Sequence, residues 1–186
     1  MNKESKHHTG VGAMFFMALL LFSFTSAFKI SARLQEKLNN AVKTTFEIEE
    51  FELELITVSN DLNSKTSVEL GGENLFTINK EEQTLGYVYL GQAPSMKNIF
   101  DYVVLFNPDM SIKKSKVLIY REDYGRQIGS QRWLKQFIGK KTGDELVYSE
   151  DVDAIAGATI SAKSMTKAVN DVLESIGVLQ ANNVLK

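Results

Sequence analysis

The chain of 186 residues has few side chains that could carry out chemistry unaided. It contains no cysteine, which excludes disulfides, thiolate nucleophiles, iron–sulfur clusters and thioether-linked haem. Its two histidines, His7 and His8, lie in a polar N-terminal tail. Neither a histidine-based zinc site nor a serine–histidine triad is therefore expected in the remaining chain. Any redox chemistry must come from a bound cofactor.

The residues best suited to hold such a ligand are Gly157, Ala158 and Thr159, which stand where a loop is predicted to enter the last helix. Small residues allow close backbone approach, and the N–H groups at a helix N-terminus favour an anion such as a phosphate. The same residues fit a simpler interpretation, in which Thr159 or Ser161 caps the helix and binds nothing. The three residues alone do not separate the two interpretations.

A longer segment, DAIAGATISAKSMTKAVNDVL from 153 to 173, resembles the flavinylation motif of the FMN-binding domain family. This family is known from the G subunit of the Rnf electron-transport complex and the C subunit of the sodium-translocating NADH:quinone reductase. Its pattern, Asp-x-x-Ser-Gly-Ala-Thr followed by Ser or Thr two residues on, is matched by Asp153, Gly157, Ala158, Thr159 and Ser161. Ala156 stands where the family usually has Ser. The resemblance implies that FMN is joined through its phosphate to the Thr159 hydroxyl.

The resemblance covers about residues 86–176, because GYVYL, DYVVLFNPDMSIKKSKVLIYRED and WLKQFIGK follow in the family's order and spacing. Where family members often read Glu-Thr-Pro-Gly, this chain has Glu122-Asp123-Tyr124-Gly125. The resemblance implies that Glu122, Tyr124 and Gly125 contact the cofactor. An aromatic face is a good partner for a flat ring, so Tyr124 is a candidate to stack on the isoalloxazine.

An uncharged segment over residues 11–28 precedes these motifs and is long enough to span a bilayer. As a helix rising about 1.5 Å per residue it reaches roughly 27 Å, close to the apolar thickness of a membrane. Lys3 and Lys6 before it, and Ser26-Ala27 near its end, also fit a signal peptide. The length of the segment favours an anchor, while basic residues on both flanks leave its orientation open.

Hydrophobic periodicity predicts an α+β domain, with an antiparallel sheet and flanking helices, after the membrane-spanning helix. Helical spacing appears between residues 30 and 42, over 129–138, and from about 161 to 176. Strands are predicted over 46–55, with a break at Glu49-Glu50, and over 75–78, 86–90, 102–106 and 116–120. The expected organisation is a polar tail over 1–10, an anchor or uncleaved signal over 11–28, and an extracytoplasmic FMN-binding domain over 29–186.

These features predict a single-pass protein of the inner or plasma membrane that relays electrons between membrane redox partners or complex subunits. Its FMN would be installed by a magnesium-dependent transferase that takes FMN from FAD, as the resemblance implies. No metal site and no catalytic residue are expected. The 21 basic residues are spread through a chain of net charge −2, which argues against nucleic acid as a partner.

Two other functions remain open at this point. One is an extracytoplasmic flavoprotein reductase acting on a soluble acceptor, for which Glu122 or Tyr124 would be the candidate proton donor. The other is an anchored binding module without redox chemistry, in which Thr159 belongs to an ordinary capped helix. Covalent attachment fits a location outside the cytoplasm, because FMN lost there would not be replaced.

Overall fold

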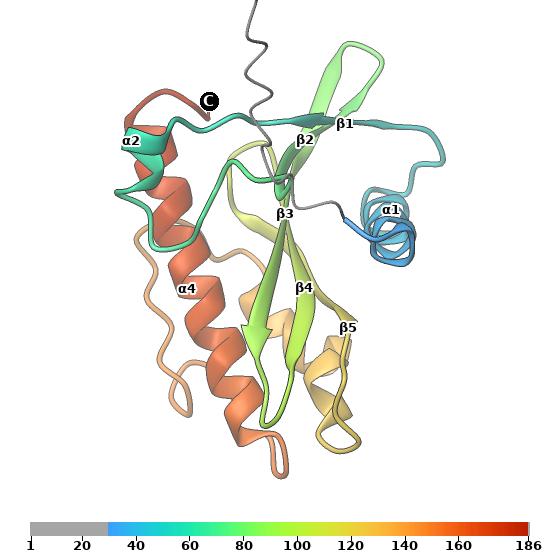
Figure 1. The fold of residues 1–186 in the computed structure, drawn as a ribbon, viewed down its shortest axis with the longest axis vertical. Coiled ribbons are helices and arrows are strands. Elements are labelled where there is room, and N and C mark those ends of the chain that lie inside the picture. The colour runs from blue at the N-terminus through green and yellow to red at the C-terminus, as the bar shows by residue number, and fades with distance from the viewer. Residues whose placement is uncertain (1–29, 186) are drawn as a thin grey trace, which may run out of the picture.

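The computed structural model describes residues 30–185 (Figure 1). In chain order the elements are α1 (Ala32–Phe46), β1 (Glu52–Leu55), α2 (Asn60–Asn63), β2 (Leu75–Lys80), β3 (Gln83–Pro94), β4 (Ile99–Phe106), β5 (Ile112–Ile119), η1 (Arg126–Gly129), α3 (Gln131–Leu134), η2 (Lys135–Phe137) and α4 (Thr159–Ala181). The predicted tail and anchor lie outside the described residues. Between residues 30 and 185, no helix combines the length and the apolar character needed to cross a membrane.

The five strands form one antiparallel sheet in which each strand pairs with the next along the chain. Strands β3 and β4 pair without a shift from Tyr87 opposite Phe106 to Pro94 opposite Ile99. Their connecting turn, residues 95–98, therefore lies at one end of the sheet. β5 finishes at that same end because it runs antiparallel to β4.

The sheet is covered on both faces, by α1 on one and by α4 on the other (Figure 1). Successive residues of β4 alternate between the two cores: Tyr102 and Val104 join the α4 side, while Val103 and Leu105 join the α1 side. Side chains of a strand point alternately to opposite faces, so a strand buried on both faces is apolar throughout. The prediction of an antiparallel α+β domain is confirmed.

Helix α1 confirms the predicted helix but extends further. It begins after Ser31, whose side-chain oxygen accepts a hydrogen bond from Leu34 N–H. It ends at Phe46, which is followed by Glu47 in the left-handed conformation. The predicted strand over 46–55 is therefore wrong in its first half, and the strand begins at Glu52. Phe46 and Ile48 mimic strand alternation because both pack on the α1-side core, one from the last turn of the helix and one just beyond it.

The segment predicted as a single helix over 129–138 is broken into η1, α3 and η2. Trp133, Leu134 and Phe137 are buried as predicted, whereas Ile138 is half exposed. The polar stretch after β1 contains the short helix α2, which the sequence pattern did not indicate. Along α4, the predicted inward residues are all buried: Met165, Ala168, Val169, Val172, Leu173 and Ile176.

Candidate functional site

Three segments that are distant in sequence meet at the end of the sheet where β3 turns into β4. They are this turn, the loop that follows β5, and the start of α4. Between them lies a pocket of about 550 Å³, within the size range of small-molecule and cofactor sites. Its lining consists of Met96, Lys97, Asn98, Tyr120, Arg121, Glu122, Asp123, Tyr124, Gly157, Ala158, Thr159, Ile160 and Ser161.

The start of α4 exposes the Thr159 hydroxyl and buries that of Ser161. Ala158 occupies the N-cap position, and no side chain in the described part of the protein caps this helix. Ser161 is 2% exposed, and its Oγ lies 2.9 Å from the Tyr120 hydroxyl. The interpretation of Thr159 or Ser161 as a cap is therefore wrong. Thr159, which is exposed, is the accessible hydroxyl at this helix end.

Two glycines shape the backbone beneath Thr159. Gly157 and Gly125 have φ angles of 76° and 75°, in the left-handed region that favours glycine. A Cβ on Gly125 would lie 2.9 Å from the Ala158 Cβ and 3.0 Å from the Gly157 carbonyl oxygen. The loop after β5 and the loop before α4 are thus packed so closely that a side chain at Gly125 would force them apart.

Glu122 lines the pocket, yet its carboxylate is bonded to the β3–β4 turn. Its Oε1 lies 2.5 Å from Ser95 Oγ and accepts hydrogen bonds from the backbone N–H groups of Lys97 at 2.8 Å and Asn98 at 2.9 Å. The bond from the Ser95 hydroxyl, together with those backbone N–H groups, lowers the pKa of Glu122 to about 2. A carboxyl group that is ionised throughout the neutral range is a poor proton donor.

Of the two other predicted residues, Tyr124 lies at the pocket and Asp153 does not. Tyr124 lines the pocket and is 84% exposed, so its ring is free to meet a ligand. Asp153 is not among the lining residues, and its main chain holds the loop to the neighbouring helical segment. Its carbonyl accepts a bond from Trp133 Nε1 at 2.7 Å, and its N–H donates to Gln136 Oε1 at 2.9 Å.

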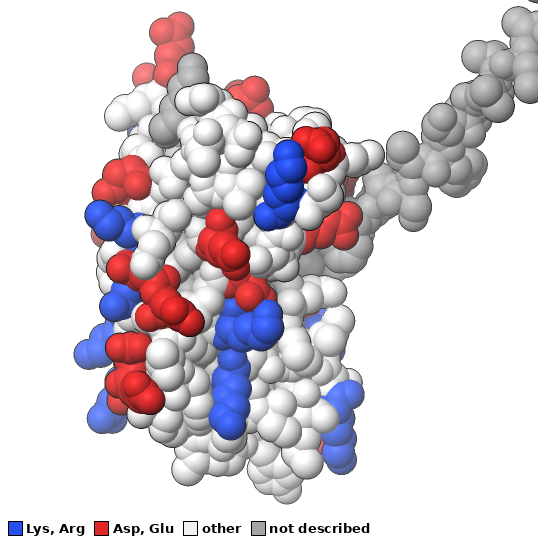
Figure 2. Space-filling view, turned by 90° about the vertical axis from the view of Figure 1, so that its left-hand side faces the viewer, with Lys and Arg blue, Asp and Glu red and all other residues white. Residues whose placement is uncertain are grey.

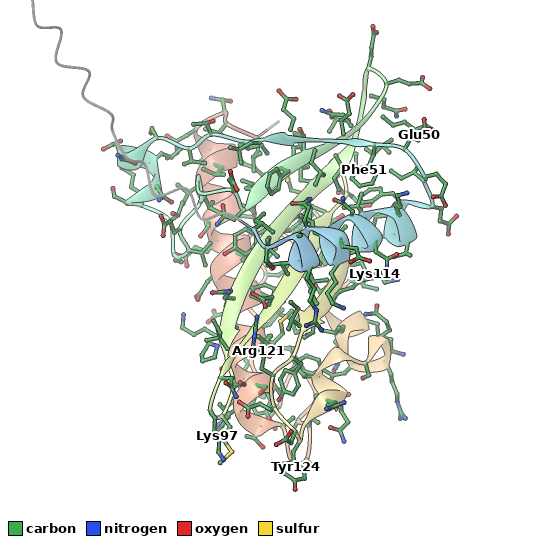
Figure 3. All side chains as sticks on the ribbon, turned by 45° about the vertical axis from the view of Figure 1, so that its right-hand side comes forward. Glu50, Phe51, Lys97, Lys114, Arg121 and Tyr124 are labelled. Carbon is green, nitrogen blue, oxygen red and sulfur yellow. The ribbon has the colours of Figure 1, made fainter. Side chains whose placement is uncertain are left out.

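Sequence reasoning missed one wall of the pocket, the turn that carries Met96, Lys97 and Asn98. Figure 3 shows Lys97 and Tyr124 at the same end of the molecule, with Arg121 farther up the sheet. Arg121 Nη2 is bonded at 2.6 Å to Asp101, which is 1% exposed. Lys97 forms no ion pair with any other described residue, so its charge is available to a ligand.

Three large apolar side chains that line the pocket are exposed to solvent. Met96, Tyr124 and Ile160 are 72%, 84% and 50% exposed, and each comes from a different one of the three segments. Figure 2 shows that charged side chains crowd the middle of the α4 side, whereas its lower edge is mostly uncharged. Clustered exposed apolar side chains of this kind mark sites of interaction.

Comparison with known proteins agrees with this geometry. Residues 97–174 match the FMN-binding domain family, and this segment contains every pocket-lining residue except Met96. The fold is similar to the crystal structure of NqrC from Shewanella oneidensis, with a TM-score of 0.58 and 16% sequence identity over 83% of this chain and 99% of that one. None of the curated proteins matches the sequence. The segment from Lys97 to Glu174, which is less than half of the chain, is therefore similar to the FMN-binding domain family.

Proposed function

We propose that the chain is a membrane-anchored electron carrier whose FMN is attached to Thr159 by a phosphoester bond. It would relay electrons between membrane redox partners, in a complex similar to Rnf or Nqr. The observation that carries the proposal is the exposed Thr159 hydroxyl at an uncapped helix N-terminus, which lines a cofactor-sized pocket in a segment similar to the FMN-binding domain family.

The residues around Thr159 fit a phosphate ester. The first N–H groups of a helix have no partner within the helix, and the helix dipole stabilises negative charge beside them. A phosphodiester retains one negative charge, which the start of α4 and the unpaired Lys97 would both stabilise. Gly157, whose missing Cβ would meet no atom within 4 Å, leaves room for the ester beside the backbone.

Attachment is a group transfer without oxidation or reduction. A bond forms between Thr159 Oγ1 and the phosphorus of the FMN half of FAD, the bond from that phosphorus to AMP breaks, and the hydroxyl proton leaves with AMP. We propose a separate magnesium-dependent flavin transferase as the catalyst, in line with the family resemblance. The tether uses the end of FMN remote from the ring, so Thr159 takes no part in electron transfer.

The bound flavin supplies the redox chemistry, and the chain positions it. Tyr124 is our candidate to stack on the ring, because it is exposed and lines the same pocket as Thr159. The apolar rim of Met96, Tyr124 and Ile160 suits contact with a protein partner at the point where electrons enter or leave. A span over residues 11–28 would hold this rim close to membrane partners, and we propose that the domain faces the extracytoplasmic side.

No particular observation favours a reductase that acts on a soluble acceptor. Such an enzyme needs a proton donor beside the ring, and the low pKa of Glu122 removes one of its two candidates.

Co-expression of the full chain with a flavin transferase tests the proposal. The wild-type protein and Thr159→Ser are expected to stay yellow after denaturation and to gain the mass of FMN less one water. Thr159→Ala is expected to lose both signals. Ser164→Ala is the matched control, because it removes a hydroxyl from the same helix outside the pocket lining, and it should retain the flavin. Unmodified wild-type protein, in cells where the transferase modifies a known substrate, would contradict covalent attachment.

A further inference from the structure

Two walls of the pocket, the loop after β5 and the β3–β4 turn, are joined by the carboxylate of Glu122. Three donors of the β3–β4 turn gather around Glu122 Oε1: the Ser95 hydroxyl and the N–H groups of Lys97 and Asn98. We infer that Glu122 is a positioning residue, which holds this turn in place as a wall of the pocket and does not itself contact the flavin. The part of the inference that concerns the flavin rests on the proposed function.

The loop that carries Glu122 is fixed independently of the turn. Arg121 bonds to the buried Asp101 at 2.6 Å and to the carbonyl of Ile99 at 2.9 Å. The Tyr120 hydroxyl lies 2.9 Å from Ser161 Oγ on α4. Gly125 packs directly against Ala158. Because these contacts tie the loop to both β4 and α4, the carboxylate sits on a rigid support.

The turn has weaker ties of its own. Ser95 N–H donates to the Asn98 carbonyl at 2.8 Å, which closes the turn but does not fix its position. A further bond, from the Asn98 side chain to the Arg121 carbonyl, is long at 3.3 Å. Met96, Lys97 and Asn98 are all exposed. Removal of the Glu122 carboxylate would therefore leave two backbone N–H groups without their acceptor and free the turn to move.

The geometry also accounts for the charge state of Glu122. Hydrogen bonds from N–H and O–H donors favour the ionised carboxylate, and bonds to a charged acceptor are stronger than those between neutral groups. The bonds therefore persist at neutral pH. They hold Met96 and Lys97 beside the opening, where their side chains would cover one side of a flavin tethered to Thr159.

Amide hydrogen exchange of the full chain without FMN tests the contact itself. In Glu122→Ala, exchange at the Lys97 and Asn98 amides is expected to become about tenfold faster or more, because loss of a charged acceptor exposes both groups. Glu122→Gln keeps a carbonyl acceptor and should show a smaller acceleration. Glu82→Ala is the matched control, since this exposed glutamate lies in the β2–β3 turn and does not line the pocket, and exchange should stay at the wild-type rate.

The flavin-loaded chain tests the consequence. Quenching of flavin fluorescence by acrylamide, a neutral quencher, should be a few fold stronger in Glu122→Ala than in wild type or Glu82→Ala, with equal covalent occupancy. Unchanged exchange in Glu122→Ala would overturn the inference, and so would faster exchange with unchanged quenching. If Glu122→Ala did not fold, wild-type exchange rates in Glu122→Asp, whose shorter side chain moves the carboxylate away, would overturn it equally. Wild-type protein without covalent flavin would contradict the proposed function, while the exchange rates would still decide whether Glu122 holds the turn.

Discussion

The starts of α1 and α4 are built in opposite ways. At α1, the Ser31 side chain accepts a hydrogen bond from Leu34 N–H at 3.3 Å. A side chain of the protein therefore caps the N-terminus of this helix. At α4, the N-cap residue is Ala158, whose side chain has no polar atom, and no described side chain replaces it. A capped helix start satisfies its own N–H groups, whereas an uncapped one beside a pocket leaves them for an anion.

The difference also separates two kinds of hydroxyl. Ser31 contributes to stability through the backbone that it caps, while Thr159 makes no such contact and stands exposed. Ser161, two residues into the same helix, is buried and paired with Tyr120. Substitutions at these three positions should therefore have distinct effects on stability and on attachment of the flavin.

The largest expected effect on stability is at Gly125, which holds the loop before α4 in place. Gly125→Ala should cost about 3 kcal/mol of unfolding free energy, because it adds a left-handed penalty to a clash with Ala158. Gly139→Ala is the control, since its φ is also positive, at 81°, but no atom lies within 4 Å of the added Cβ. It should cost about 1 kcal/mol. Equal losses in urea denaturation would show that the close packing at Gly125 is unimportant.

A smaller effect compares the two helix starts directly. Ser31→Ala should cost about 1 kcal/mol, the usual value of an N-cap side chain. Thr159→Ala should change stability by less than about 0.5 kcal/mol, as is typical of an exposed residue without a specific contact. Both changes can be measured by urea denaturation of the chain without FMN. A loss at Thr159 as large as that at Ser31 would mean that Thr159 acts as a structural cap after all.

The smallest effect concerns the pH range over which the turn stays closed. The pKa of Glu122 falls from 4.5 to about 2 in the folded chain, so its contribution is complete above about pH 4.5 and is lost as the pH falls toward 2. Amide protection at Lys97 and Asn98 should therefore survive at pH 4 and disappear near pH 2. Glu122→Gln should abolish this dependence. Opening of the turn with a midpoint near pH 4.5 would show that the carboxylate is not bonded as described.

Much of the fold follows from local patterns in the sequence. The helical period of Met165, Val169 and Val172 fixes the buried face of α4, and the continuous apolar run of β4 reflects burial on both sides. The strand predicted from residue 46 fails because a short alternating stretch does not distinguish a strand from the end of a helix. The predicted burial of Ile138 is wrong because the helical segment ends at Phe137, one residue before it.

The part of the site formed by consecutive residues can be predicted from the sequence. The part that depends on where strands β3 and β4 turn cannot. Gly157, Ala158 and Thr159 follow one another, so their motif is visible in the sequence. Met96 and Lys97 reach the pocket because β3 continues to Pro94 and turns there, which no local signal specifies. Likewise, the sequence directs attention to Glu122 but cannot show that its partners lie 24 to 27 residues earlier in the chain.

Peptide mapping decides whether Thr159 carries the flavin. The full chain, co-expressed with a flavin transferase, would be purified, digested, and analysed by tandem mass spectrometry. We predict a single modified peptide with the FMN mass localised to Thr159 and an unmodified Ser161. Recovery of the Thr159 peptide entirely without FMN, or with FMN on another residue, would contradict the account.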